Sequence, residues 1–316
     1  MTESVSSSPR QAVRSGEDTG LAVRRRRIPH LLRQVLSFLL LLLLVALVWE
    51  GIKLVGGNPW RPDENPFAIE HDPPYRFKFA SDLNLPHLWD VARAFGNPSR
   101  RNGPPLISVL VEAAYFTFRE AFAGFLIGAF LGLLLGIVFA HSRLLERGLM
   151  PYVVASQTVP ILAIAPMVVI WLQAGWVSVA VIAAYLTFFP VTINTLRGLR
   201  SPDPMALELM HSYAASQWAI LWKLRFPAAL PYIFTALKVS ATASVVGAII
   251  GELPSGIRGG LGGAILNFNS YYISGPGRLW AAIIASAAVG ILFYLLVTVV
   301  ESLVLQRRAG ATDQIA

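Results

Sequence analysis

The sequence predicts an all-α polytopic membrane protein with six transmembrane helices. Of its 316 residues, 55% are hydrophobic and only 14% are charged, whereas a soluble domain carries about 25% charged residues. No charged residue occurs from Gly148 to Leu196. Because about 20 apolar residues cross the hydrocarbon core as one helix, this run alone is long enough for two spans.

The composition also argues against several classes of function. The net charge of +8 comes from basic residues scattered over short loops, which is typical of orientation signals in membrane proteins rather than of a nucleic-acid site. There is no cysteine, and the five histidines form no pair at ligand spacing, so no metal site is expected. No G-x-x-x-x-G-K-[ST] phosphate loop is present, so we expect that the chain does not itself hydrolyse ATP.

The first span is predicted over residues 31–55. It follows a Ser-rich, basic segment, residues 1–30, that we expect to be a disordered cytoplasmic tail, because Arg24–Arg27 place the N-terminus inside. A cleaved signal peptide is the alternative, but no small-x-small cleavage site follows the apolar run. Near the end of the span, Glu50 and Lys53 stand one turn apart, and we expect them to form an ion pair.

Residues 56–105 form a polar, proline-rich segment that this topology places outside the cell membrane. One short amphipathic helix is predicted within it, around Pro86–Phe95. A solvated linker is the favoured interpretation of the segment, and a lid or a partner-binding surface is the alternative.

The next apolar run, Leu106–Ala140, is too long for one simple crossing. We expect an interfacial helix over Leu106–Phe118 and a second span over Ala121–Ala140, separated by the charged pair Arg119 and Glu120. Glycine recurs every four residues along the second span, which predicts a smooth helix face that another helix can approach closely. The glycines are Gly124, Gly128, Gly132 and Gly136.

The third span is predicted over Leu149–Leu172, after a short cytoplasmic loop marked by Arg143 and Arg147. Two prolines, Pro160 and Pro166, lie inside this span. An interior proline frees a backbone carbonyl that neighbours or water must satisfy, so it marks either a pathway-lining break or a simple kink. A turn at Gln173–Trp176 leads to the fourth span, Val177–Leu196.

The fifth span is predicted over Pro231–Ile250 and the sixth over Leu279–Val300, joined by a Gly- and Asn-rich loop, Leu253–Arg278. Arg307 and Arg308 place a short C-terminal tail, residues 306–316, in the cytoplasm. Lys238 lies inside the fifth span, and we expect it to snorkel towards the cytoplasm, with an inter-helix role as the alternative.

The segment between the fourth and fifth spans is amphipathic and charged. Asp203 suits a helix N-cap and Pro204 the first helical position, so we expect a helix to about Tyr213. Ala214-Ala215-Ser216 predicts a break before a second short helix, Gln217–Leu224, and Pro231 is expected to restart a helix in the membrane. Such a surface helix can either receive force from a soluble partner or simply lie on lipid headgroups.

This segment resembles the signature loop of bacterial ABC importer permeases. Glu208 matches the leading acid of that loop, and Ala215-Ser216, Trp222 and Phe226–Pro231 match the remainder. The chain departs from the pattern in two ways: Leu209 and Met210 replace two alanines, and Ala214 stands where a glycine is expected. The nitrate/sulfonate/taurine-type branch is indicated by further matches, at Trp49-Glu50, at Pro160 through Pro166, and at Gly260-Leu261-Gly262.

The resemblance covers about Leu31–Leu305 and implies a type I ABC importer (MetI-like) permease fold. Residues 106–305 would form its five-helix core, including a coupling segment at 201–226. It implies a bacterial inner-membrane permease that is not an enzyme and binds no cofactor. Its implied partners are a second copy of the chain, cytoplasmic ATPase subunits that use ATP, and an extracytoplasmic substrate-binding protein. The implied cargo is a small polar solute: a sulfonate, nitrate, or a heterocycle such as a thiamine precursor or riboflavin.

Two sets of site residues follow as hypotheses. The resemblance implies that Glu208, Ala214, Ala215 and Ser216 contact the ATPase. Polar residues near the predicted span ends are candidates for the substrate pathway, and we expect Glu252 to be solvated or to line an outer gate with Asn267 and Asn269. The pathway candidates are Gln157, Thr158, Glu252 and Asn267.

Two other classes of function remain as alternatives. A stand-alone channel or an ion-coupled secondary transporter usually needs ionisable residues buried in mid-span, and Lys238 is the main candidate for such a residue. A membrane-embedded enzyme would need a nucleophile or metal constellation, and the sequence shows none.

Overall fold

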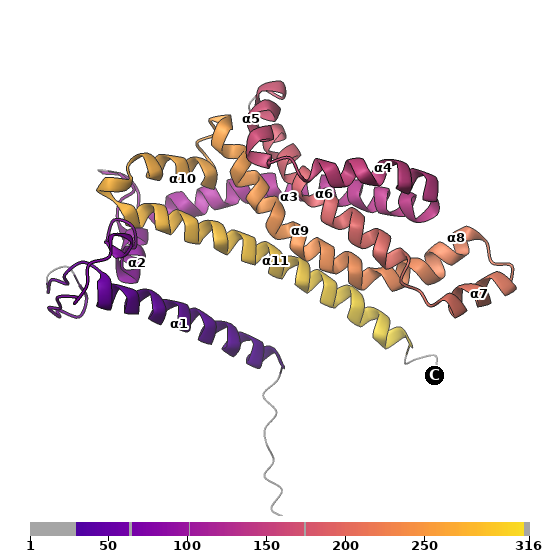
Figure 1. Ribbon diagram of the computed structural model, residues 1–316, viewed down its shortest axis with the longest axis horizontal. Coiled ribbons are helices and arrows are strands. Elements are labelled where there is room, and N and C mark those ends of the chain that lie inside the picture. The colour runs from indigo at the N-terminus through magenta and orange to yellow at the C-terminus, as the bar shows by residue number, and fades with distance from the viewer. Residues whose placement is uncertain (1–29, 63–64, 101, 174, 313–316) are drawn as a thin grey trace, which may run out of the picture. The chain divides into compact units, whose positions relative to one another are not determined.

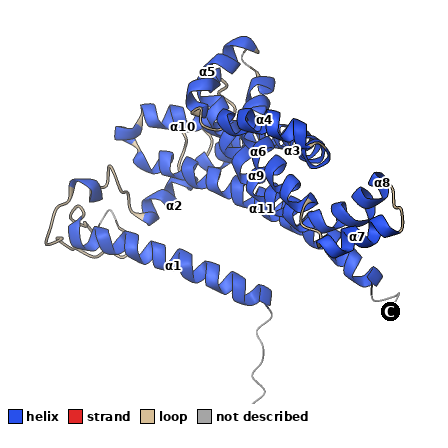
Figure 2. Ribbon diagram, turned by 45° about the vertical axis from the view of Figure 1, so that its right-hand side comes forward, coloured by secondary structure: helices blue, strands red, loops and turns tan. Residues whose placement is uncertain are grey.

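The computed structural model describes residues 30–62, 65–100, 102–173 and 175–312, and within these ranges every regular element is a helix (Figures 1 and 2). The fold divides into two units, residues 1–49 and 50–316. The predicted disordered tail lies almost entirely outside the described residues. The helices are α1 (His30–Gly56), α2 (Leu88–Gly96), α3 (Leu106–His141), α4 (Arg143–Ser156), α5 (Ile161–Trp171), α6 (Trp176–Leu199), α7 (Pro204–Ser212), α8 (Gln217–Ile220), α9 (Phe226–Ser255), α10 (Leu261–Ser270) and α11 (Pro276–Thr312).

The membrane spans agree in number with the sequence. Within the described part of the chain, five helical stretches are long and apolar enough to cross a membrane, and a sixth is reached if the bent pair α4–α5 counts as one span. This confirms an all-α polytopic fold. The five stretches are Leu36–Gly56, Leu106–His141, Trp176–Leu199, Gln217–Ser255 and Pro276–Leu305.

The core of the larger unit is built from α3, α6 and α9, and α6 packs against each of the other two more extensively than any other pair of described helices packs (Figure 1). The glycine face of α3 makes this possible, as predicted. A Cβ atom built on Gly128 would lie 2.5 Å from the Ala184 carbonyl oxygen, and one on Gly124 would lie 2.5 Å from the Ala183 Cβ. On α9, a Cβ on Gly247 would lie 2.8 Å from the Ala183 Cα. The three helices therefore meet almost backbone to backbone.

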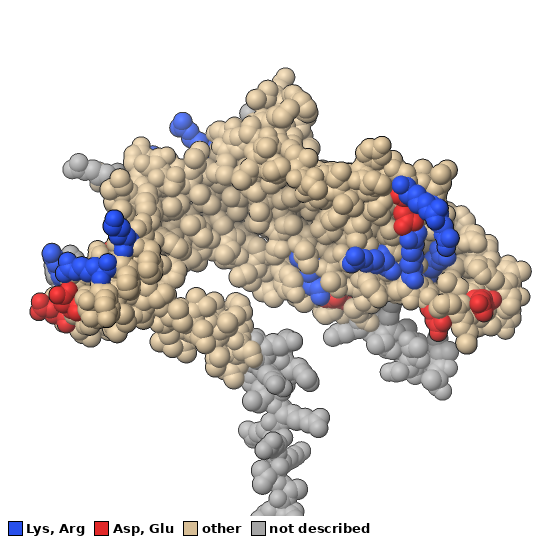
Figure 3. Space-filling model, in the orientation of Figure 1, with Lys and Arg blue, Asp and Glu red and all other residues tan. Residues whose placement is uncertain are grey.

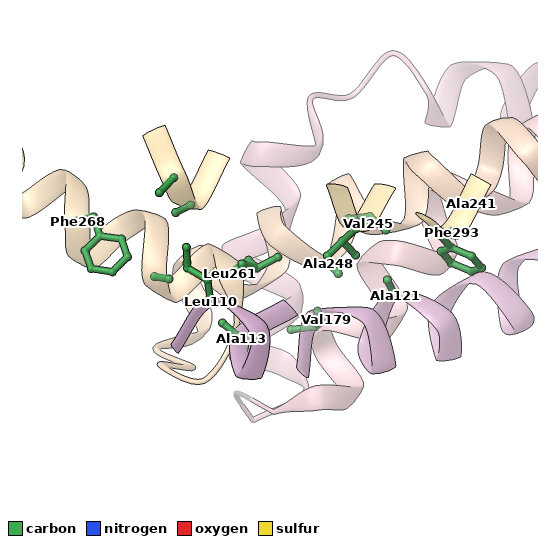
Figure 4. Packing of buried hydrophobic residues seen from close by; sticks show 14 of the residues in the cluster. Leu110, Ala113, Ala121, Val179, Ala241, Val245, Ala248, Leu261, Phe268 and Phe293 are labelled. Carbon is green, nitrogen blue, oxygen red and sulfur yellow. The ribbon is translucent and has the colours of Figure 1, made fainter. Parts of the chain in front are cut away.

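Larger side chains fill the space at the edges of this contact. Buried residues of α3, α9, α10 and α11 form the largest hydrophobic cluster (Figure 4). Phe293 of α11 is fully buried, and its ring centroid lies 5.0 Å from that of Phe125 on α3. This cluster fixes α10 and α11 against the outer half of the core.

The predicted split of Leu106–Ala140 is wrong, because α3 is one uninterrupted helix of 36 residues. No proline stops the helix, and Glu120 is buried against the core rather than marking a membrane surface. At 1.5 Å per residue α3 is about 54 Å long, so it extends beyond a hydrocarbon core of about 30 Å.

The third span is broken rather than continuous. Helices α4 and α5 meet at an angle of 96°, and Pro160 is the residue that precedes α5, where its missing N–H costs nothing. Pro166 lies inside α5 without interrupting it. Arg143 and Arg147, predicted to lie in a loop, are helical, because the Ser142 hydroxyl caps α4 by accepting from the Leu145 N–H at 3.3 Å.

The fifth span differs from the prediction at both ends. Pro231 restarts no helix, since the chain is helical from Gln217 to Ser255. A π-helical turn at Leu221–Arg225 joins α8 to α9 just before Pro227, whose missing N–H then falls in the first turn of α9. The loop predicted over Leu253–Arg278 contains α10. The predicted C-terminal tail is helical as far as Thr312.

Three charged residues form ion pairs or hydrogen bonds with residues that the sequence did not identify as their partners. Lys238 does not snorkel; the alternative of an inter-helix role is the one observed, because Lys238 pairs with Glu301 of α11 at 2.8 Å. Glu50 and Lys53 do not pair with each other. Glu50 accepts from His87 at 2.8 Å and from the Leu88 N–H at 2.8 Å, and the fully buried Lys53 donates to Asp82.

The segment 56–105 is folded rather than a solvated linker. The Trp60 ring stands edge-on to the rings of His71, His87 and Trp89, and α2 packs against α11. Burial raises the pKa of Asp90 in this segment, against the opposing charges of His87 and Arg93. These contacts give the segment a small core of its own.

Candidate functional site

The predicted coupling segment has the local structure expected from its sequence. The Asp203 carboxylate accepts from the Met205 N–H at 3.0 Å and caps α7, which begins at Pro204. The chain leaves the helix after Ser212, and the Ser216 hydroxyl accepts from the Ala219 N–H at 3.2 Å to cap α8. No residue of α7 is buried, and Glu208 is exposed on it. The segment thus offers a capped, rigid and uncovered helix to a partner.

An aromatic pair follows on the membrane side of this segment. Trp218 and Trp222 stack with ring centroids 6.5 Å apart and remain 68% and 55% exposed. The Trp222 ring also lies 5.1 Å from that of Phe226. Exposed tryptophans prefer the boundary between headgroups and hydrocarbon, so this pair places α8 at the membrane surface and leaves α7 on the water side.

Ala214 adopts a backbone conformation that suits glycine. Its φ is +52°, in the left-handed region where a Cβ costs about 1 kcal/mol. We expect Ala214→Gly to keep the turn and to stabilise it by a few tenths of a kcal/mol to about 1 kcal/mol, after allowing for the greater freedom of glycine in the unfolded chain. Hydrogen exchange across residues 210–220 measures this, and faster exchange in the variant would contradict it. Ala219→Gly, in helical backbone, is the control and should exchange faster.

The second candidate site lies at the opposite end of the core, around Glu252. This residue is 1% exposed, so the expectation that it is solvated is wrong. Its Oε1 accepts from the Thr117 hydroxyl of α3 at 2.7 Å, and its Oε2 accepts from the Gly262 N–H at 2.6 Å. The Thr117 oxygen in turn accepts from the Leu261 N–H at 2.8 Å. Glu252 therefore holds the first turn of α10 against α3 and α9.

The glycines flanking Leu261 are explained by this contact. A Cβ atom on Gly260 would overlap the Glu252 carboxylate, and one on Gly262 would lie 2.9 Å from Glu252 Oε2. Only glycine lets the backbone approach the carboxylate this closely. The Gly260-Leu261-Gly262 motif, Glu252 and Thr117 thus form one structural unit. We call this unit the α10 clamp.

A second buried carboxyl lies beside the clamp and was missed as a site residue. Glu120 of α3 is 1% exposed and interacts electrostatically with Glu252. Neither of its carboxyl oxygens has a hydrogen-bond partner among the described residues. The signal was present in the sequence as a charged residue inside an apolar run, but it was interpreted as a helix boundary.

An open cleft of about 900 Å³ adjoins the clamp and contains two of the four pathway candidates. Glu252 and Asn267 both line it, together with the charged residues Arg100, Glu112 and Arg258. The cleft can therefore present both signs of charge and an amide to a small polar molecule. Asn269 is not among its lining residues.

The other two pathway candidates lie elsewhere, at the bend between α4 and α5. The Thr158 hydroxyl donates to the Ala155 carbonyl at 2.7 Å. The Gln157 Nε2 is buried without a hydrogen-bond partner among the described residues. The Tyr185 hydroxyl of α6 donates to the Ser156 carbonyl and so ties down the bend. Neither Gln157 nor Thr158 lines the open cleft beside the clamp.

Comparison with known proteins shows which family this chain resembles. Residues 105–306 match the model of a family described as "Binding-protein-dependent transport system inner membrane component". The formylaminopyrimidine transport permease protein ThiX of Halalkalibacterium halodurans is 31% identical over 236 residues, covering 72% of this chain and 93% of the relative. The riboflavin transport system permease protein RibX of Chloroflexus aurantiacus is 33% identical over 171 residues, covering 54% and 63%.

A solved structure supports the fold alone. The crystal structure of an amino acid ABC transporter with histidines superposes with a TM-score of 0.50 at 17% identity. The superposition covers 64% of this chain and 94% of that one.

Proposed function

Because the chain belongs to the family of binding-protein-dependent transport system inner membrane components and is thus the permease subunit of an ABC transporter, we propose a route by which it couples ATP use to import. A cytoplasmic ATPase subunit contacts α7 and the turn after it, through Glu208, Ala214, Ala215 and Ser216. Movement of this segment reaches the outer cleft through α9. The chain binds no cofactor itself, and the ATP is used by the partner.

The observation that carries this proposal is the unbroken helix from Gln217 to Ser255. Its 39 residues span about 58 Å, and its cytoplasmic end adjoins the exposed helix α7. Glu252, which holds α10 in the clamp, lies one turn from its other end. A displacement of α7 therefore has a stiff connection to the residue that holds the outer cleft in shape.

Two exposed surfaces are suited to the partners that this function requires. The exposed apolar face of α5 is suited to pack against a second copy of the chain, as in a homodimer that encloses a pathway. Its outward residues are Leu162, Met167, Ile170 and Trp171, each at least half exposed. An extracytoplasmic substrate-binding protein would dock at the side of the cleft and the folded segment 56–105. We also propose that this multi-pass protein of the inner membrane has both termini in the cytoplasm.

We propose that the substrate is a small polar solute. It would enter from outside through the open cleft that adjoins the α10 clamp. Arg100, Arg258, Glu112 and Asn267 at the cleft suit a molecule with both donors and acceptors. A heterocycle such as a thiamine precursor or riboflavin fits this description, as do a sulfonate and nitrate. Gln157 and Thr158, at the bend of α4 and α5, are proposed to line a deeper part of the pathway.

The test is Glu208→Arg, which reverses the charge on the exposed face of α7. We expect uptake into cells or proteoliposomes to fall at least about tenfold, since a like-charge contact costs 1.4 kcal/mol or more. The ATPase subunit should also be lost on purification in mild detergent. Glu70→Arg makes the same charge change at an exposed position of the segment 56–105, away from α7, and should leave ATPase recovery unchanged.

Two outcomes would contradict the proposal. Normal uptake by the Glu208→Arg variant would remove the coupling role of α7. Transport by the reconstituted chain without an ATPase subunit would favour a stand-alone channel or an ion-coupled secondary transporter. The partly buried pair Lys238–Glu301 is the feature that such a transporter could use.

A further inference from the structure

A second cavity, unrelated to the clamp, lies where α4 faces the end of α6. It has a volume of about 700 Å³. Arg143 and Arg147 of α4 and Arg200, just after α6, line it together with one acidic residue, Glu146. Figure 3 shows basic side chains gathered around a small acidic patch at the α4 end of the molecule. The cavity therefore brings three guanidinium groups and one carboxylate together.

Glu146 neutralises one of the three arginines. The Arg200 Nη1 donates to Glu146 Oε1 at 2.7 Å, and its Nη2 donates to Oε2, which makes a two-pronged ion pair that ties α6 to α4. Arg143 and Arg147 are one helical turn apart and exposed, and neither forms an ion pair or a hydrogen bond with any of the described residues. The cavity thus keeps two positive charges that are available to an anion.

The remaining wall of the cavity is apolar. Met150, Pro151 and Val154 continue down the same helix from the arginines. No residue of α4 is buried, and Leu144 and Tyr152 are 82% and 74% exposed. A free inorganic anion would use the arginines and leave this apolar wall in contact with water. A molecule with a charged head and an apolar tail would satisfy both parts.

The position of the cavity indicates where such a molecule comes from. Arg143 follows the end of the span α3 by two residues, and Arg200 follows the end of the span α6 by one. Both ends are on the basic, cytoplasmic side of the chain. The cytoplasmic leaflet carries anionic lipids that attract arginines near the surface, and guanidinium groups bind phosphate oxygens in pairs.

We propose that this cavity binds one anionic phospholipid of the cytoplasmic leaflet. Arg143 and Arg147 contact the headgroup phosphate, and an acyl chain lies along Met150, Pro151 and Val154. The Glu146–Arg200 ion pair holds the two walls of the cavity at a fixed separation. A bound lipid would then brace α4 against α6 on the cytoplasmic side of the bend at Pro160.

The test measures lipid binding directly and does not depend on the proposed transport function. The purified complex in detergent is titrated with phosphatidylglycerol or phosphatidylcholine, and the bound lipid is counted by native mass spectrometry. Arg143→Gln/Arg147→Gln should bind the first phosphatidylglycerol about thirtyfold more weakly, from the attraction of two arginines to an anionic headgroup. Phosphatidylcholine binding should not change.

The control removes two exposed cytoplasmic charges that do not line the cavity. Arg197→Gln/Lys223→Gln should bind phosphatidylglycerol as the unmodified chain does, and equal melting temperatures would show that both variants are folded. An equal loss in the control, or no loss in the Arg143/Arg147 variant, would overturn the proposal. Displacement of the lipid by excess inorganic phosphate would show a simple anion site instead. Unchanged lipid binding with loss of the ATPase subunit would assign the cavity to a protein contact.

Discussion

Replacing Gly128 with leucine is expected to prevent the α3–α6 core from forming. A Cβ atom at this position would lie 2.5 Å from the Ala184 carbonyl oxygen and 2.6 Å from the Thr187 Cβ. Backbone cannot move aside as a flexible side chain can, so the helices must separate and lose contact along their length. We expect a cost above about 3 kcal/mol. Size-exclusion chromatography of the solubilised protein should show little monodisperse species.

The matched control is Gly290→Leu in α11. No atom lies within 4 Å of a Cβ built at Gly290, so the same substitution should be accepted there without loss of folded protein. A Gly128→Leu variant that elutes and melts like the unmodified chain would show that α3 and α6 can separate without cost. The close packing would then contribute little to the stability of the fold.

Replacing Glu252 with alanine is expected to release α10 and to abolish uptake. The Gly262 N–H and the Thr117 hydroxyl would both lose their acceptor inside the protein. Leaving a buried donor without an acceptor costs about 1–3 kcal/mol each, so the clamp would open in most molecules. Hydrogen exchange across residues 260–270 should accelerate strongly, whereas exchange in the α3–α6 contact should stay slow. Exchange that stays slow at residues 260–270 would contradict the clamp.

Replacing the neighbouring Glu120 with glutamine is expected to have the opposite effect on stability. Two adjacent buried carboxyl groups repel when both are ionised, and the oxygens of Glu120 have no hydrogen-bond partner among the described residues. An amide cannot ionise and can donate to Glu252. The variant should therefore be as stable as the unmodified chain or more so. A loss comparable to that of Glu252→Ala would show that the Glu120 carboxyl group is needed for the fold.

Features that depend on nearby residues were predictable from the sequence. The apolar runs gave the number of spans, and the glycine spacing indicated the close face of α3. The Asp203 cap and the break at Ala214-Ala215-Ser216 follow from residues within one turn of each other. Each of these rests on helix periodicity or on a cap, which act over a few residues.

Features that depend on distant residues were not predictable. Thr117 and Glu252 are 135 residues apart, and nothing local indicated that the carboxylate would be buried. Lys238 likewise meets Glu301 only because α9 and α11 are neighbours. Glu50 and Lys53 have the spacing of an exposed pair, but partners from the segment 56–105, His87 and Asp82, displace that weak local contact.

The continuity of α3 illustrates a different limit of prediction from the sequence. Charges in an apolar run usually mark a membrane surface, yet Glu120 is accommodated inside the protein beside the clamp. Whether such a residue is enclosed by the protein depends on contacts between helices that are distant in the sequence, and these form only in the assembled core. The site residues at Gln157 and Thr158 were similarly placed by their polarity alone, which carries no information about the bend that follows them.

The backbone-to-backbone packing of α3, α6 and α9 limits the ways in which this permease can change shape. Glycine and alanine have no rotamers, so a seam made from Gly124, Gly128, Ala183 and Gly247 offers no second arrangement of side chains into which it could switch. Sliding one helix past another would bring Cβ atoms onto backbone oxygens. The three helices should therefore move as a single rigid block during transport. Alternation between states would then take place along surfaces of larger side chains, such as the exposed face of α5.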